Sequence, residues 1–206
     1  MVRLTGVGML FMAAALAAES PAGHYVLRGV MEVGSELLLK PDGTFEYMLA
    51  YGAADYEASG TWKVDGDSVV LTTGGEEKQA FRLIRSAAVK GDGIRVIVKG
   101  PSGAPADHID VGVKTAEGYV NATTDDSGVA TLATKSPVSA VAFRIAVYDY
   151  AAGPFPVNPQ HNEFQFEIDG EAITRVPFRN ERLKINGTTL EMRFWNRDKV
   201  MNYEKQ

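Results

Sequence analysis

The sequence predicts an all-β protein built from antiparallel strands. After Pro21, apolar and polar residues alternate with a period of two along many short stretches, which is the pattern of strands with one buried face. Turn-forming residues separate these stretches at short intervals. No stretch has a 3.6-residue period long enough for a packed helix.

The first part of the chain predicts six strands joined by short turns. Lys40-Pro41-Asp42-Gly43 combines a fixed φ at proline with a glycine that accepts positive φ, and Asp65-Gly66 is the residue pair of a tight hairpin. Such turns join antiparallel neighbours. Phe45, Tyr47 and Leu49 share one face of their strand, which we expect to point inward. The expected strands are 25–32, 36–40, 44–51, 56–64, 68–73 and 79–85.

The middle of the chain predicts a small inserted β-sandwich over residues 91–150. A polar joint, Lys90-Gly91-Asp92-Gly93, precedes it and suggests a domain boundary. Loops rich in Pro, Gly, Ser and Asp at 101–105 and 125–128 divide it into short apolar segments. The expected strands are 94–98, 109–115, 119–123, 129–133 and 141–148.

The last part of the chain is expected to complete a barrel with the first. Residues 151–162 contain three prolines and few large apolar groups, so we expect a linker that does not pair into a sheet. The tail beyond it, about 44 residues, is too short to bury its own core, and barrel closure would remove exposed strand edges. Residues 163–206 should therefore close the barrel begun by 19–90. The expected strands are 163–168, 173–178, 182–185, 189–195 and 200–204, with hairpin turns at Asp169-Gly170 and Asn186-Gly187.

The N-terminus predicts a secretory signal peptide over residues 1–18. Arg3, the apolar run 7–16 and the small-residue pattern Ala15-Leu16-Ala17 are its three parts, with cleavage after Ala17 or Ala18. The run is shorter than the roughly 20 residues that cross a bilayer, so no membrane span is expected after cleavage. The chain has no cysteine, which argues against a lipoprotein and removes disulfides as a source of stability. We expect a periplasmic or secreted protein.

Charge argues against nucleic acid as a partner. The formal net charge of the chain is -5, and loss of Arg3 with the signal peptide makes it more negative. The Lys and Arg residues are scattered along the sequence, whereas a nucleic-acid-binding surface needs them clustered.

Two segments resemble known families. Gly23-His24-Tyr25, residues 37–45 and residues 60–71 resemble lipocalin-like (calycin-type) domains of bacterial envelope proteins over residues 23–86, and Met201-Asn202-Tyr203 resembles their closing strand. Lipocalins carry Gly-x-Trp on the first strand, whereas here it lies downstream, at Gly60-Thr61-Trp62. Residues 122–130 resemble a carboxypeptidase regulatory-like or transthyretin-like sandwich. The first resemblance implies a barrel that holds a ligand, and the second implies a non-catalytic adhesion or scaffold module.

The histidines predict no catalytic centre. His24, His108 and His161 lie in three different parts of the chain, and no Gly-x-Ser-x-Gly motif is present. His108 and Asp110 would share one face of a strand and could begin a metal site, although a solvated beginning of a strand is the preferred interpretation. We therefore predict no catalytic, cofactor-binding or metal-binding residues.

Acidic pairs and acceptor patterns also have simple interpretations. Asp125-Asp126-Ser127-Gly128 lacks the spaced oxygen ligands of a calcium loop, so a plain turn is preferred. Glu76-Glu77 and Asp125-Asp126 are neighbours that diverge, so they are interpreted as solubilising charge. Asn121 and Asn186 match the glycosylation acceptor pattern, which we discount because the signal peptide looks bacterial.

Aromatic residues offer two interpretations of the barrel interior. An eight-stranded barrel is wide enough for one small ligand, yet large side chains can also simply fill it, and filling is the preferred interpretation. The aromatic set expected in the barrel is Tyr25, Tyr47, Tyr51, Tyr56, Trp62 and Phe81.

The leading functional hypothesis is a non-catalytic binding or structural protein without a cofactor, whose partner is a small apolar ligand or an envelope protein. The first alternative is an envelope hydrolase whose site is assembled only in the fold. The second is a structural partner of an envelope assembly, recognised through a sheet edge or an apolar patch. The sequence identifies neither the ligand-binding residues nor the oligomeric state.

Overall fold

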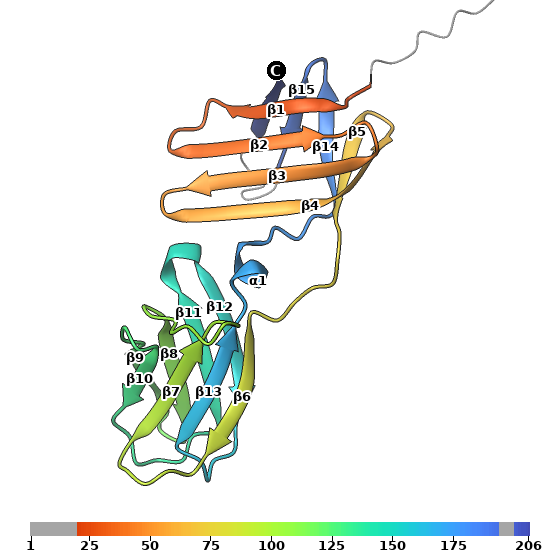
Figure 1. The fold of residues 1–206 in the computed structure, drawn as a ribbon. Coiled ribbons are helices and arrows are strands. Elements are labelled where there is room, and N and C mark those ends of the chain that lie inside the picture. The colour runs from red at the N-terminus through yellow and green to blue at the C-terminus, as the bar shows by residue number, and fades with distance from the viewer. Residues whose placement is uncertain (1–19, 194–199) are drawn as a thin grey trace, which may run out of the picture.

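The computed structural model describes residues 20–193 and 200–206. It confirms an all-β protein with a closed eight-stranded antiparallel barrel, interrupted by two four-stranded sheets (Figure 1). The signal peptide expected at 1–18 lies outside the described residues, as does part of the strand expected at 189–195.

Strands from both ends of the chain form the barrel, in the order β1-β16-β15-β14-β5-β4-β3-β2. The tail thus closes the barrel as expected, through three strands. Because β1 pairs with β16, the two ends of the described chain lie side by side. The barrel strands are β1 (Gly23–Arg28), β2 (Val33–Leu39), β3 (Thr44–Tyr51), β4 (Ala54–Asp65), β5 (Ser68–Thr73), β14 (Arg179–Asn186), β15 (Thr189–Met192) and β16 (Met201–Lys205).

Alternation along these strands fills the barrel. In β3, residues Phe45, Tyr47 and Leu49 are buried, whereas their neighbours face outward, as the period of two requires. Leu37 and Leu39 of β2 and the corresponding residues of the other strands join them in a single core cluster. The barrel interior is therefore packed with side chains.

The two remaining sheets face each other as a sandwich with its own core. Buried residues from both sheets form one cluster, in which the ring of Phe81 stacks on that of Phe143 with centroids 4.1 Å apart. One sheet has the order β10-β7-β13-β6 and the other β12-β11-β8-β9. The strands are β6 (Phe81–Ala87), β7 (Ile94–Lys99), β8 (Asp110–Thr115), β9 (Gly118–Thr123), β10 (Val129–Leu132), β11 (Ala140–Ile145), β12 (Tyr150–Pro156) and β13 (Glu163–Ile168).

The sandwich takes strands from both sides of the expected 91–150 insert. The strand expected at 79–85 was assigned to the barrel, but its counterpart β6 pairs with β13. Residues 163–168 were expected to close the barrel, but β13 lies between β6 and β7 and buries Phe164 and Phe166 in the sandwich. These assignments were wrong because an alternating strand does not specify which apolar core its buried face joins.

Residues 151–162 do not form only a linker. β12 pairs antiparallel with β11, so the expectation that this segment cannot join a sheet was wrong. The two prolines Pro154 and Pro156 are tolerated because β12 is an edge strand, which needs ladder hydrogen bonds on one side only.

The strand expected at 173–178 begins instead as a short helix, α1 (Gly170–Thr174). Asp169, expected in a hairpin turn, caps it, since its carboxylate accepts a hydrogen bond from the Glu171 backbone N–H at 3.1 Å. An extended segment follows and returns to the barrel, where the Val176 N–H donates to the Glu57 carbonyl at 2.8 Å.

The insert leaves and re-enters the barrel at one place. The Thr73 hydroxyl donates to the Val176 carbonyl at 2.8 Å and accepts from the Phe178 N–H at 2.9 Å. Phe178 then packs edge-on against Tyr47 inside the barrel, with centroids 5.0 Å apart. The two connections are thus held together where they meet the barrel.

Candidate functional site

A cleft of about 580 Å³ lies where the barrel meets the sandwich, and we call it the joint cleft. Its walls come from β4, from both connections and from the tip of the β11–β12 hairpin, which approaches β4 in Figure 1. Its apolar floor is formed by the segment around Val176. The tyrosine and basic side chains that line it are Tyr56, Lys78, Tyr148, Tyr150, Arg175 and Arg179.

Three tyrosines from the two halves of the molecule line the joint cleft. The Tyr56 hydroxyl donates to the Tyr148 carbonyl at 3.3 Å, and their rings make an edge contact with centroids 5.7 Å apart. Asp149 adopts a left-handed conformation with φ 45°, which reverses the chain after the 3-10 turn η1 (Ala146–Tyr148) and starts β12 at Tyr150. Burial raises the pKa values of Tyr56 and Tyr150.

Most charges in the joint cleft are already paired. One Arg179 nitrogen lies 2.8 Å from each carboxylate oxygen of Glu77. Lys78 lies 2.9 Å from a carboxylate oxygen of Glu171, and Asp149 faces Arg144 at 3.7 Å. These pairs cancel each other's charge locally.

Arg175 is held differently. Its Nη1 donates to the backbone carbonyl of Glu76 at 2.8 Å, and a Cβ added to Gly75 would lie 3.1 Å from its Nη2. The guanidinium thus rests against a glycine that leaves room for it. Within the described residues Arg175 makes no ion pair with a carboxylate.

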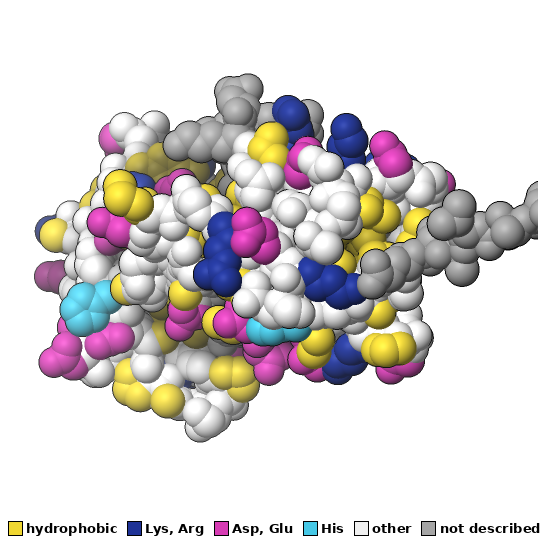
Figure 2. All heavy atoms as spheres, turned by 90° about the horizontal axis from the view of Figure 1, so that it is seen from above, with side chains coloured by type: hydrophobic (Ala, Val, Ile, Leu, Met, Phe, Trp, Pro, Cys, Tyr) yellow, Lys and Arg dark blue, Asp and Glu magenta, His cyan; other side chains and the backbone are white. Residues whose placement is uncertain are grey.

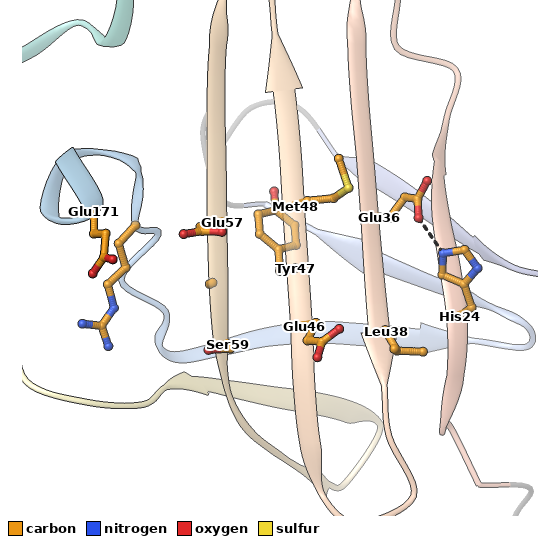
Figure 3. Close-up of a pocket in the computed structure, with 11 residues that line it drawn as sticks. His24, Glu36, Leu38, Glu46, Tyr47, Met48, Glu57, Ser59 and Glu171 are labelled. Carbon is orange, nitrogen blue, oxygen red and sulfur yellow. Dashed lines mark hydrogen bonds and ion pairs between the residues drawn. The ribbon is translucent and has the colours of Figure 1, made fainter.

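A second, more open hollow of about 770 Å³ runs over the outer face of β1 to β4. Figure 3 shows His24 and Glu36 at one side, Glu171 at the other, and Glu46, Met48 and Glu57 along the strands between. His24 Nε2 lies 2.8 Å from Glu36, and Glu46 pairs with Lys40 at 2.6 Å. These groups are spread along neighbouring strands and do not converge. In the described ranges no three His, Asp or Glu residues are grouped to hold a metal.

A third hollow, of about 470 Å³, lies on the outer face of the sheet β12-β11-β8-β9. Its floor is Gly112, where an added Cβ would lie 2.9 Å from Asn121 Oδ1. Asp110 accepts a hydrogen bond from Thr123 at 2.9 Å, and Tyr119 is half exposed at the side. Its walls come from one sheet alone.

The barrel interior offers a ligand little room. Tyr203, Tyr47 and Ser35 form a buried chain in which the Ser35 hydroxyl lies 2.8 Å from that of Tyr203 and donates to the Met48 carbonyl at 2.6 Å. Desolvation raises the pKa of Tyr203 above its usual range. No buried side-chain N or O among the described residues lacks a hydrogen-bond partner. This polar chain is therefore part of a filled core.

Only some of the aromatic residues expected in the barrel lie there. Tyr25 and Tyr47 are in the barrel core, and Trp62 packs partly buried against it while its Nε1 donates to the Lys40 carbonyl at 2.9 Å. Tyr56 also contacts the barrel core but turns toward the joint cleft. Tyr51 is 58% exposed, and Phe81 belongs to the sandwich core, so these two assignments were wrong.

The three histidines stay apart. His24 is in the outer hollow of the barrel. His108 precedes β8 with φ 56°, and its exposed ring pairs with the adjacent Asp107 at 3.1 Å. His161 Nδ1 lies 2.8 Å from the hydroxyl of Ser86, which is 75 residues away in the sequence.

The Ser86–His161 contact lacks the third group of a catalytic triad. Asn158 accepts from the Gln160 N–H through Oδ1, and its Nδ2 lies 3.4 Å from His161 Nε2. Within the described residues no carboxylate pairs with the His161 ring. A Ser-His-Asp site would need such a carboxylate to orient the imidazole. The contact instead ties β6 to the loop before β13.

The other polar candidates lie in turns and at the edge of the joint cleft. Asp125 Oδ1 accepts from the Ser127 and Val129 N–H groups, and the Val129 bond is the main cause that lowers the pKa of this carboxyl. The Asn186 side chain donates to Glu191 at 3.1 Å. Glu77, interpreted as solubilising charge, pairs with Arg179 in the joint cleft.

Sequence reasoning missed Tyr148, Tyr150 and Arg175. They were assigned to a strand end, to the residue before the linker and to a strand interior, and nothing in their spacing brings them together. The sequence does carry a signal at the two connections between the barrel and the sandwich: glycines at 74 and 75 and a proline at 177 are typical of chain segments between strands.

Comparison with family models, with curated proteins and with solved structures finds no match for this chain. Among the helices in the described ranges, none has the length and hydropathy to span a membrane.

Proposed function

We propose that this chain is a non-catalytic binding protein of the bacterial envelope that holds a small ligand in the joint cleft. One observation carries the proposal: tyrosines from both halves of the molecule, and one arginine without an ion-pair partner among the described residues, surround the same cavity. Ligand sites favour such interfaces and combine apolar and aromatic walls with a few positioned polar groups.

The size and composition of the cleft support a small molecule. Its volume of about 580 Å³ falls within the usual range of ligand cavities, roughly 300–1,000 Å³. Tyr148 and Tyr150 present ring surface, and their hydroxyls make no hydrogen bond within the described part of the chain. They can bind the body of a ligand and still donate to it.

A site in the cleft replaces the barrel-interior site that the lipocalin resemblance suggested. The packed barrel core favours a structural role for the barrel aromatics. Within the described residues one histidine contacts a serine hydroxyl, His161, and no carboxylate orients its ring, which argues against the hydrolase alternative there.

Family and localisation belong to the same proposal. The eight-stranded barrel with Trp62 capping the turn at Lys40 is compatible with a lipocalin-like domain, and the inserted sandwich with a transthyretin-like or carboxypeptidase regulatory-like module. The pattern of residues 1–18 supports export to the periplasm or beyond.

Ligand-observed NMR with a library of small apolar and aromatic fragments tests the proposal. The wild type is compared with Tyr148→Ala and with a matched control, Tyr119→Ala, on β9 at the opposite edge of the sheet from β12. Loss of one aromatic wall should weaken binding about three- to tenfold, and the control should not. Absence of any bound fragment, or binding that ignores Tyr148→Ala, would refute the cleft as the site. Thermal unfolding of each variant verifies the fold.

A protein-docking role is the second candidate, and the rim of the barrel favours it. Val30 and Met31 lie in the connection between β1 and β2, next to Tyr51 at the end of β3, since Val33 pairs with Tyr51. Met31 is 90% exposed. Affinity purification from the envelope with wild type and Met31→Glu tests this role. An envelope protein retained by the wild type and lost with Met31→Glu supports docking, and equal recovery refutes it.

A further inference from the structure

We propose that the ligand of the joint cleft carries an oxyanion, a carboxylate or a phosphate ester, that binds Arg175 while an aromatic body packs on Tyr148 and Tyr150. This inference rests on the proposed function and specifies its ligand class. It follows from the charges around the cavity and from the way Arg175 is held.

The charges of the joint cleft leave one cation available. Arg179 pairs with Glu77, Lys78 pairs with both Glu171 and Asp169, and Arg144 faces Asp149. Within the described residues this leaves Arg175 as the cation of the cavity lining that has no carboxylate within ion-pair distance. A ligand oxyanion would supply that missing ion-pair partner.

The Arg175 side chain is positioned before any ligand arrives. Its bond to the Glu76 carbonyl uses one N–H of Nη1, and Gly75 leaves space beside Nη2. A guanidinium has five N–H donors, so several remain for a bidentate contact. Little conformational freedom should be lost when an anion binds, which favours affinity.

The aromatic wall selects the rest of the ligand. Tyr56 is committed to the contact with Tyr148, which fixes the ring of Tyr148 at the edge of the cavity. Tyr150 lies beyond the left-handed residue Asp149 and is partly desolvated, which raises its pKa and keeps its hydroxyl protonated as a donor. A planar or apolar body with an acidic end therefore fits, and a cation does not.

Matched pairs of acids and neutral amides test the ligand class. The probes are 4-hydroxybenzoate with 4-hydroxybenzamide, 2-naphthoate with 2-naphthamide, and phenyl phosphate with inorganic phosphate alone. The variants are Arg175→Gln, Arg175→Lys and a control, Arg85→Gln, which removes the same charge from an exposed position on β6. Affinities are measured by ligand-observed NMR titration, and circular dichroism checks each fold.

The wild type and Arg85→Gln should bind an acid at least about tenfold more tightly than its amide, and Arg175→Gln should abolish the preference. Arg175→Lys should keep part of it, since the charge remains without the bidentate geometry. Phenyl phosphate against the benzoates shows which oxyanion is preferred. Equal binding of acid and amide by the wild type, or an acid preference that survives Arg175→Gln, overturns the inference.

A gain of affinity provides a second test. Glu77→Gln removes the partner of Arg179 and leaves a second cation in the cavity, so acids should bind about two- to fivefold more tightly. Damage to the fold cannot produce that gain, and weaker acid binding would contradict the charge argument. If neutral and acidic probes bind equally and Tyr148→Ala weakens the binding of both, the ligand class fails while the proposed function stands.

Discussion

At the scale of single residues, Gly60 marks the place where β4 passes from one partner strand to the next. It pairs with Phe45 of β3 and with Thr73 of β5. A Cβ at this position would lie 2.1 Å from the Thr72 carbonyl oxygen and 2.7 Å from the Gly74 nitrogen. Only a residue without a side chain allows this close approach of two backbones.

Gly60→Ala should therefore destabilise the protein by roughly 2–3 kcal/mol, because backbone atoms must move to accept the methyl group. Urea denaturation measures the change. Gly34→Ala in β2 is the matched control, since no atom lies within 4 Å of its added Cβ, and it should change stability by less than about 0.5 kcal/mol. Equal effects of the two substitutions would contradict the packing of β4 against β5.

Burial of Tyr203 should make the folded state less stable at alkaline pH. Its folded-state pKa is raised above the ordinary value of 10.0 by desolvation, so the folded state holds the phenolic proton more tightly than the unfolded state. The stabilisation is complete below the unfolded pKa and is lost as the pH rises above it. It should fall by about 1.4 kcal/mol between pH 8 and pH 11.

Tyr203→Phe tests this linkage. The variant should lose about 1 kcal/mol at pH 8, because the hydroxyl that bonds Ser35 is gone, and its stability should fall less steeply toward pH 11 than that of the wild type. Urea denaturation at both pH values gives the two numbers. An alkaline loss of the same size in both proteins would rule out Tyr203 as the source.

At the scale of elements, Thr73 joins the end of β5 to the segment that leads into β14. Thr73→Val keeps the shape of the side chain but removes two hydrogen bonds, to the Val176 carbonyl and from the Phe178 N–H. Stability should fall by roughly 1–3 kcal/mol. Thr72→Val, which loses one exposed contact of 3.3 Å, should cost less than about 0.5 kcal/mol in the same urea experiment. A smaller loss for Thr73→Val than for Thr72→Val would contradict the junction.

The strands themselves were largely predictable, whereas the identity of their partners was not. Alternation in 44–49 and the turn at Pro41-Asp42-Gly43 are local signals, and β3 forms as they indicate. The prolines of β12 indicate a loop when the sequence is considered alone. They fit a strand only because β12 lies at the edge of its sheet, and that position depends on strand pairing that the local sequence does not reveal. Residues 173–178 were expected to form a strand, but Asp169 caps a helix that includes Ile173.

At the scale of the whole molecule, closure of the barrel by the tail was predictable because the tail is too short to bury its own core. The candidate site was not, since its residues come from β4, from the hairpin tip and from the connection after α1. These segments meet only because the barrel and the sandwich, each with its own core, are joined at one place.

Figure 2 shows acidic and basic side chains mixed on the face seen from above, so no surface of a single charge sign there suggests another partner.

Native mass spectrometry of the protein purified from the envelope fraction tests the central claim, that the joint cleft holds a small ligand. The wild type and Tyr119→Ala should carry a reproducible extra mass of one small molecule, which organic solvent releases. Tyr148→Ala should retain less of this mass, because it removes a wall of the cleft. A ligand-free wild type, or a mass that Tyr148→Ala retains in full, would contradict a binding role for the joint cleft.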